Sequence, residues 1–235
     1  MEKLRTHHIL NYLKERKRCT LAELMRRFRV SSATIHRDVD ELAKRDAVTR
    51  VRGGLIWNDA MPVTADGADY QERVVTNRKA KLAAARKALA LVTEGDIVFL
   101  DSSTTVYELA MLLRGTDFGH LTIVTNSVSI MQNFRKFPQH WVLIGLGGNY
   151  DPQLNSILGA AALEQLSHFN ITKAFVSAFG VDARNVTTNH ERQAELIRRV
   201  LDTAEKRYLI VDRSKLGRTG LYRLSPRGGF DAIFS

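Results

Sequence analysis

The sequence predicts a small helical domain followed by a larger α/β domain whose sheet is mostly parallel. Residues 1–57 combine short amphipathic helical segments with a Gly-Gly turn, whereas short apolar runs alternate with helical segments from residue 78 onward. Continuous apolar strands with helices between them are typical of a parallel sheet that is covered on both faces.

The chain has 235 residues and a net charge of +10, and the small domain carries most of this excess. Residues 1–57 hold 14 Lys and Arg against seven Asp and Glu, which indicates a polyanion as their partner. No apolar stretch is long enough to span a bilayer, so we expect a cytoplasmic protein without a membrane partner. The single cysteine, Cys19, excludes an internal disulfide and a zinc site of several cysteines, and we expect neither metal nor cofactor.

The first helices are predicted from the spacing of their apolar residues and from their capping residues. Apolar residues at helical spacing predict a helix over residues 4–16. Thr20, followed three residues later by Glu23, forms a capping-box pattern and predicts that a second helix begins at residue 21.

A third helix is expected over residues 32–46, capped by Ser31 or Ser32, because its apolar residues share one face. The β-branched residues and the Gly-Gly turn of residues 48–57 then predict a two-stranded wing. Two helices joined by a tight turn, after a supporting helix, make a winged helix-turn-helix, a fold that reads DNA.

In such a fold the third helix presents its first residues to base edges, and the wing contacts phosphates or a minor groove. Arg37 can donate two hydrogen bonds to a guanine or bind a phosphate. Asp38 is interpreted as a structural residue that could orient Arg37. The predicted DNA-binding residues are Ser31, Ser32, Thr34, His36, Arg37, Arg50 and Arg52.

Residues 58–77 are interpreted as a linker between a domain at 1–57 and a domain at 78–235, because they are mostly small or polar. The Ala-rich stretch that begins at Arg78 predicts a helix. Further along the chain, strands are expected at 96–100, 121–125, 141–145, 173–179, 207–212 and 231–235, and helices at about 104–113, 127–136, 157–168 and 190–204.

Four consecutive hydroxyl residues, Ser102 to Thr105, follow the strand at 96–100 and open a helix. Free N–H groups and the positive end of a helix dipole favour a phosphate or a carboxylate there, whereas an ordinary helix cap needs only one hydroxyl. Ligands of open α/β sheets bind at the carboxyl ends of the strands, so polar residues after several strands can converge. The predicted effector-binding residues are Asp101, Ser102, Ser103, Thr104, Thr105, Asn126, Gly147, Gly148 and Lys215.

Residues 21–54 resemble the N-terminal domain of the DeoR family of bacterial transcription regulators. That domain has a V-S-x-x-T-I-R-R-D-L core and a basic wing that ends in Gly-Gly. The matching residues are Val30, Ser31, Thr34, Ile35, Arg37, Asp38, Gly53 and Gly54. His36 stands where the family usually has arginine, a departure expected to keep the fold and to alter the operator sequence or weaken binding.

The second domain resembles the sensor domain of the same family, which carries D-x-G-T-T, T-N-S, G-G and D-x-S-K in this order. The matching residues are Asp101, Thr104, Thr105, Thr125, Asn126, Ser127, Gly147, Gly148, Asp212, Ser214 and Lys215. The resemblance covers essentially the whole chain and implies a fold similar to ribose-5-phosphate isomerase.

The resemblance further implies a phosphorylated sugar as the effector, with Thr104, Thr105 and Lys215 as phosphate contacts. Asp101, Asn126 and Gly147 would then lie near the sugar. Ser103 replaces the family glycine and adds bulk where the backbone normally approaches the phosphate. Family members commonly continue through one more helix and strand, so the resemblance suggests truncation at the C-terminus and an exposed sheet edge.

We therefore predict a DNA-binding transcription regulator, a repressor of a carbohydrate-utilisation operon, which binds a double-stranded operator as a homodimer or homotetramer. A sugar-phosphate isomerase fused to a DNA-binding domain is the main alternative, and it needs a well-placed carboxylate base. The nearest match to the isomerase's acidic cluster, residues 66–70, lacks its glutamate and falls in the linker, so we do not expect an enzyme. A ligand-free oligomerisation domain is a third possibility.

Overall fold

The computed structural model describes residues 2–16, 18–44, 48–51, 53–57 and 70–235. The chain forms two compact units, residues 1–67 and residues 68–235, and each is described by itself below. No helix in the described ranges combines the length and apolarity needed to cross a bilayer.

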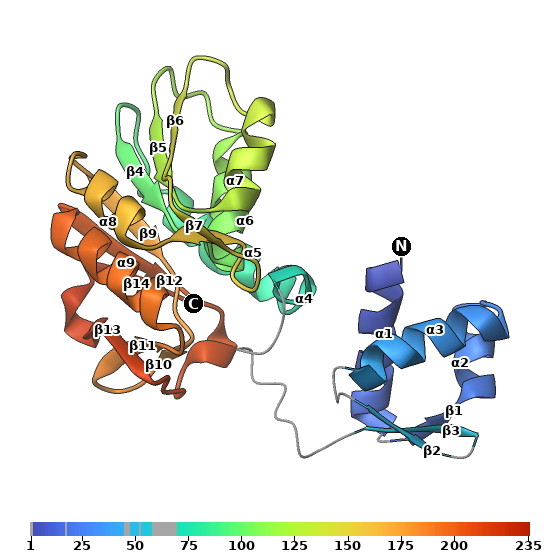
Figure 1. Ribbon diagram of the computed structural model, residues 1–235. Helices are drawn as coiled ribbons and strands as arrows, with labels where there is room; N and C mark the ends of the chain where they lie inside the picture. Colours follow the sequence, from blue (N-terminus) through green and yellow to red (C-terminus); the bar gives the residue numbers. More distant parts are fainter. Residues whose placement is uncertain (1, 17, 45–47, 52, 58–69) are drawn as a thin grey trace. The chain divides into compact units, whose positions relative to one another are not determined.

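The first unit consists of helices packed on a small antiparallel sheet with strand order β1-β3-β2, as Figure 1 shows. Its elements are α1 (Glu2–Arg16), β1 (Arg18–Thr20), α2 (Leu21–Phe28), α3 (Ser32–Lys44), β2 (Val48–Val51) and β3 (Gly54–Trp57). The predicted helices and the wing are confirmed. Strand β1 was not predicted, and it turns the two-stranded wing into a three-stranded sheet by pairing with β3.

Local hydrogen bonds set the limits of α2 and α3. The Thr20 hydroxyl accepts from the Glu23 N–H (3.1 Å), and the Glu23 carboxylate accepts from the Thr20 N–H (2.7 Å), so the predicted capping box is present. Arg29 ends α2 in the left-handed conformation with φ 52°. The Ser31 hydroxyl then accepts from the Thr34 N–H (3.3 Å) at the start of α3.

A buried ion pair ties α1 to α3. Asp38 is fully buried among the apolar residues of α3, and its carboxylate accepts two hydrogen bonds from the Arg5 guanidinium (2.5 and 2.9 Å). Asp38 is therefore structural, as interpreted, but its partner is Arg5 of α1 and not Arg37. The surrounding core consists of Ile9, Leu13, Cys19, Leu24, Ile35, Val39, Leu42, Val48 and Leu55.

The second unit is built on a parallel sheet with strand order β14-β12-β9-β4-β5-β6 (Figure 1). These strands are β4 (Ile97–Leu100), β5 (Thr122–Thr125), β6 (Val142–Gly145), β9 (Lys173–Val176), β12 (Lys206–Ile210) and β14 (Ala232–Phe234). Five of them lie within predicted apolar runs, and β12 begins one residue before its predicted run at 207–212. Every pairing between them is parallel, so the predicted sheet is confirmed.

Helices cover both faces of this sheet, as Figure 1 shows. The helices on one face are α5 (Arg78–Leu89), α6 (Thr104–Leu113) and α7 (Val128–Asn133), and those on the other are α8 (Ala160–Leu166) and α9 (Glu191–Thr203). Successive strand residues alternate between two apolar cores, as in β4, where Val98 and Leu100 enter one core and Phe99 enters the other.

Several short elements were not predicted. They are helix α4 (Tyr70–Val75), the hairpin of β7 (Asn149–Asp151) and β8 (Ser156–Leu158), the antiparallel sheet of β10 (Gly180–Val181), β11 (Asn185–Thr188) and β13 (Tyr222–Pro226), and the 3-10 turns η2 (Arg213–Lys215) and η3 (Arg227–Gly229). The helix expected at about 127–136 consists of α7 and a terminal 3-10 turn, η1 (Phe134–Lys136). Helix α4 falls inside the stretch interpreted as a linker. The helix expected from residue 157 begins only at Ala160, because residues 156–158 form β8 and Gly159 turns the chain with φ 100°.

The strand order reverses at the boundary between β4 and β9. Strands β5 and β6 follow β4 on one side, and the chain then returns to place β9 on the other side of β4. The carboxyl ends of these two strands therefore form the switch point at which open α/β sheets bind ligands.

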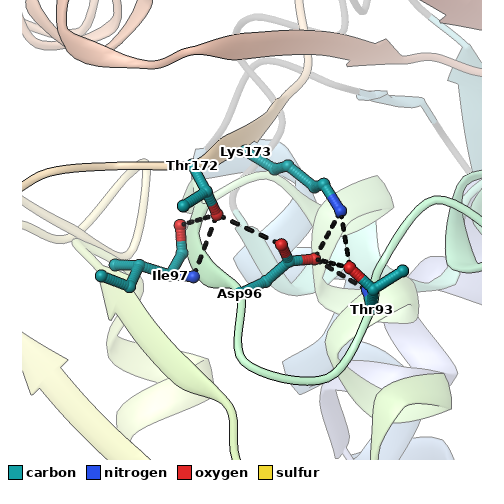
Figure 2. A network of polar contacts seen from close by, with 5 residues as sticks. All are labelled: Thr93, Asp96, Ile97, Thr172 and Lys173. Atoms are coloured by element: carbon teal, nitrogen blue, oxygen red, sulfur yellow. Dashed lines mark hydrogen bonds and ion pairs between the residues drawn. The ribbon is translucent and has the colours of Figure 1, made fainter.

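A polar network fastens β4 to β9 at their amino ends, as Figure 2 shows. The Asp96 carboxylate accepts from the Lys173 ammonium (2.7 Å), from the Thr93 N–H (2.7 Å) and from the Thr172 hydroxyl (3.4 Å). The Thr172 hydroxyl in turn accepts from the Ile97 N–H (3.0 Å). Side chains thus reinforce the β4–β9 pairing where the two strands begin.

We predict that Asp38→Ala lowers the free energy of unfolding of the first unit by about 3 kcal/mol, because it removes the buried carboxylate that pairs with Arg5. Asp40→Ala is the matched control, since Asp40 is an exposed aspartate of the same helix, and we expect it to cost less than about 1 kcal/mol. Thermal unfolding of the full chain, followed by circular dichroism, measures both effects. Equal losses of unfolding free energy in the two variants would contradict a stabilising role for the buried Arg5–Asp38 ion pair.

Candidate functional site

Helix α3 turns a polar face to solvent at its start. Ser32, His36 and Arg37 are exposed, whereas Ile35 and Asp38 of the same turns are buried. No hydrogen bond or ion pair of Arg37 is found among the described residues, so its guanidinium is available to a ligand. The predicted DNA-binding residues of α3 therefore lie on one surface.

Ser31 and Thr34 are engaged with each other at the start of this face. Their hydroxyls are 2.9 Å apart, and the Ser31 hydroxyl also caps α3 through the Thr34 N–H. Ser31 is exposed and Thr34 is half-buried, so both keep some access to solvent. The capping role explains a serine at position 31 without a DNA contact.

Arg50 of the wing binds to α3. One guanidinium nitrogen lies 2.7 Å from His36 Nδ1, and the other donates to the Asp40 carboxylate. A guanidinium has only donors, so His36 Nδ1 accepts and the neutral ring carries its proton on Nε2. Two predicted DNA-binding residues thus form one exposed cluster with Asp40, while Arg52 lies outside the described residues.

In the second unit, Asp101 links the ends of β4 and β9. Its carboxylate accepts from the Ser103 N–H (2.8 Å) and from the Ser177 N–H (2.7 Å). Asp101 is 1% exposed, and burial raises the pKa of its carboxyl while these hydrogen bonds oppose the rise. This carboxylate lies between two strand ends, where it contacts the backbone of Ser103 and Ser177 and the Ser103 side chain.

The hydroxyl-rich turn after β4 combines a helix cap with unused donors. The Ser103 hydroxyl caps α6 by accepting from the Val106 N–H (3.1 Å). Within the described part of the chain, no hydrogen bond engages the backbone N–H groups of Thr104 and Thr105, or the hydroxyls of Ser102, Thr104 and Thr105. One hydroxyl of the predicted four is thus a cap, and the other three remain available beside the free N–H groups.

A buried lysine on α5, the helix that packs against α6, was not predicted. Lys81 of α5 is 5% exposed, and its ammonium donates to the Arg73 carbonyl. Burial lowers the pKa of Lys81 to about 8; the charges of Lys215 and Arg73 act in the same direction, and those of Asp212 and Glu108 oppose it. Lys81 therefore stands among charged groups from α4, α6 and the loop after β12.

The sequence contains a signal for Lys81. Lys81 occupies the same helical face as Ala84, Ala85 and Ala88, and those three alanines are fully buried. A lysine on the apolar face of a helix is unusual, because a buried ammonium needs a partner. Alanine content alone predicts the helix that begins at Arg78, and it does not single out the lysine on its apolar face.

The loop after β12 is tied to the start of α5. The Asp212 carboxylate accepts from the Ser214 N–H (3.0 Å) and from the Asn77 side-chain amide (3.2 Å), and Asp212 is 1% exposed. The Lys215 ammonium lies 5.6 Å from the centroid of the Phe179 ring. This loop brings Lys215 close enough to Lys81 to affect its pKa.

The other predicted effector-binding residues follow β5 and β6. Asn126 is 1% exposed; its amide donates to the Ser156 hydroxyl (2.7 Å), and its Oδ1 has no partner among the described residues. Gly148 has φ 146°, and a Cβ there would lie 2.6 Å from the Leu158 carbonyl, so the hairpin itself requires glycine. The Gly147 N–H is likewise occupied, by the Gln165 side chain (2.9 Å).

The predicted effector-binding residues do not form one compact cluster. By strand spacing, the end of β6 lies about 19 Å from the end of β12. The two glycines and Lys215 therefore belong to loops on opposite sides of the turn after β4. The turn after β4 stands near the centre of the row of strand ends, close to the switch point.

A winged helix-turn-helix with an exposed basic surface, followed by a parallel α/β unit with a donor-rich helix start, defines a DNA-binding regulator with a second, ligand-binding unit. Family models agree: residues 5–61 match the DeoR-like helix-turn-helix domain, and residues 76–235 match the DeoR C terminal sensor domain. The chain belongs to the DeoR family of transcription regulators.

Curated relatives span almost the whole chain. The HTH-type transcriptional repressor GlcR of Bacillus subtilis is 28% identical over 97% of this chain and 85% of its own length. The L-fucose operon activator of Haemophilus influenzae is 29% identical over 97% of this chain and 89% of its own length. The glycerol-3-phosphate regulon repressor of Escherichia coli is 26% identical over 100% of this chain and 91% of its own length. These relatives are named as regulators, so the predicted regulator is confirmed in preference to the isomerase alternative.

Solved structures with a similar fold include a D-ribose-5-phosphate isomerase in complex with phospho-erythronic acid. It has a TM-score of 0.43 and 17% identity, and the match covers 59% of this chain and 54% of that one. The eIF2B delta subunit of Chaetomium thermophilum has a TM-score of 0.46 and 13% identity, and the match covers 68% of this chain and 56% of that one. At such identity the likeness concerns the fold alone.

We predict that Arg37→Ala weakens binding to DNA selected by the wild-type protein from a random pool, by about 10- to 100-fold. Arg37→Lys separates two roles, because lysine preserves a phosphate contact but loses the paired hydrogen bonds to a guanine. Arg86→Ala is the matched control, since it removes the same charge from an exposed site on α5. Fluorescence anisotropy measures the affinities, and an unchanged affinity for Arg37→Ala would refute the assignment.

Proposed function

We propose that the chain represses a carbohydrate-utilisation operon and that a phosphorylated sugar, bound to the second unit, controls the repression. Residues 1–57 would bind the operator, residues 78–235 would sense the effector, and residues 58–77 would join them. The names of the relatives support this proposal, because they refer to a fucose operon and a glycerol-3-phosphate regulon, and two of the three are repressors.

One observation carries the effector proposal: the start of α6 has unused donors, and the buried Lys81 interacts with the charges of Glu108 of the same helix and of Lys215 after β12. The free N–H groups of Thr104 and Thr105 lie at the positive end of a ten-residue helix, an arrangement that favours a phosphate. The hydroxyls of Ser102, Thr104 and Thr105 add further donors. Lys81 and Lys215 would neutralise the phosphate charge from the neighbouring elements.

The sugar would extend from this phosphate towards β5. Asn126 offers a buried acceptor, Oδ1, that lacks a partner among the described residues and suits a sugar hydroxyl. Asp101, Ser103, Gly147 and Gly148, which the sequence also assigns to the site, would act by holding the backbone around it. The proposed role of Asp101 thus shifts from contacting the sugar to positioning the turn.

The DNA-bound state would contain more than one copy of the chain. A single small DNA-binding module buries too little surface for specific recognition, so we propose a homodimer or homotetramer acting in the cytoplasm. Effector binding would change the spacing of the DNA-binding units and lower the affinity for DNA.

We predict that inorganic phosphate and sugar phosphates bind the full chain and that Lys81→Met weakens this binding. Between pH 7.5 and 9.5 the wild-type affinity should fall about tenfold, because Lys81, with its pKa of about 8, loses its proton as pH rises. The other charged groups around Lys81 are Arg73, Asp212, Lys215 and Glu108. Lys81→Met should show a flat profile.

Isothermal titration calorimetry with inorganic phosphate, glycerol 3-phosphate, ribose 5-phosphate and a hexose 6-phosphate measures these affinities. Lys79→Met is the matched control, because Lys79 is an exposed lysine of the same helix. Binding that survives both Lys81→Met and Lys215→Met would refute the phosphate site. Turnover of a sugar phosphate in the same samples would favour the isomerase alternative.

A further inference from the structure

Helix α4 is the first described element after residues 58–69, which connect the second unit to the DNA-binding unit, and it packs against α6. Lys81 donates to the Arg73 carbonyl, and the Arg73 guanidinium donates to the Gln153 carbonyl between β7 and β8 (3.3 Å). Asn77, just after α4, donates to Asp212 (3.2 Å). The segment 70–77 thus contacts elements around the proposed effector site.

Tyr70, the first residue of α4, has a buried hydroxyl that makes no regular hydrogen bond within the described part of the chain. The residue is 2% exposed, and its Oη has no hydrogen-bond partner among the described residues. Burial raises the pKa of Tyr70 to about 12. A weak hydrogen-bonding contact with the Ser129 hydroxyl, which already accepts from the Asn155 amide (2.7 Å), opposes the rise, and the Asp101 carboxylate adds a smaller effect in the same direction as burial. The phenol therefore stays neutral and can both donate and accept.

A buried hydroxyl without a partner calls for an explanation, since folded proteins satisfy nearly all such groups. Asn126 Oδ1 is a second unsatisfied atom of this kind, and it follows β5, the neighbour of β4. Tyr70 lies close enough to Asp101, at the end of β4, for the two to affect each other electrostatically. Two unsatisfied polar atoms, one on α4 and one just after β5, suit the hydroxyls of one polyol.

We propose that Tyr70 is an effector-binding residue whose hydroxyl hydrogen bonds to the sugar part of the effector, so that α4 senses occupancy of the site. This inference rests on the proposed function, since it assigns a further ligand and a route of regulation to the same site. The bound sugar joins α4 to the strand ends. The connection to the DNA-binding unit immediately precedes α4 in the chain, so occupancy of the site acts on the element to which that connection is joined.

Tyr70→Phe tests the contact because it removes only the unsatisfied oxygen. The variant should be at least as stable as the wild type without ligand, since it no longer buries an unpaired hydroxyl. It should bind inorganic phosphate within twofold of the wild type but lose about tenfold in affinity for the sugar phosphate that the wild type prefers. Tyr208→Phe, at a buried tyrosine of β12 that packs on Phe175, is the control and should bind both ligands normally.

Hydrogen exchange of the full chain tests the route of regulation. The sugar phosphate should slow amide exchange in α4 and just after it, as at the Thr76 N–H that donates to the Glu72 carbonyl of α4 (3.1 Å), in the wild type and less in Tyr70→Phe. The variant should also need about tenfold more sugar phosphate to release DNA. A wild-type protein that binds no probe would overturn the proposed function and this inference together. Normal sugar-phosphate binding by Tyr70→Phe would overturn this inference alone.

Discussion

The pairing of β4 with β9 is the constraint on which the second unit depends. It is fastened at the amino ends by the Asp96–Lys173 network and at the carboxyl ends by Asp101, which accepts from the Ser177 N–H. Asp101 also accepts from the Ser103 N–H, just before α6. One buried carboxylate thus holds the sheet and the start of α6 together, so the direction in which the free N–H groups of α6 point follows from it.

Polar groups at the carboxyl ends of the strands divide into those that the protein satisfies and those that it does not. Ser103, Asp212 and Gly147 are engaged by neighbouring atoms, and their residue types follow from folding. Tyr70 and Asn126 each keep an unsatisfied atom in the described structure. Burial of a polar atom without a partner is unfavourable, so the unsatisfied atoms indicate a ligand more strongly than the satisfied groups do. The sequence motifs nevertheless emphasise the satisfied groups.

The sequence predicts what depends on local spacing and misses what depends on distant contacts. The helices of the first unit and the six parallel strands follow from apolar periodicity, and the Thr20 capping box follows from two residues three positions apart. The Arg5 partner of Asp38 could not be inferred, since 33 residues separate them. Helix α4 was missed because it is six residues long and begins directly after a stretch of small and polar residues. Strands such as β10 are too short to show a pattern.

His36 shows how a departure from the family pattern fits the local structure. The family arginine at this position would bring a second guanidinium to Arg50, and two groups that only donate cannot hydrogen bond to each other. A neutral histidine accepts from Arg50 through Nδ1 and keeps Nε2–H as a donor, while Asp40 binds the other side of the same guanidinium. The wing is thereby joined to α3 before DNA is bound. The cost is one positive charge on the DNA-binding surface, so this chain depends more on hydrogen-bond geometry at position 36 and less on charge.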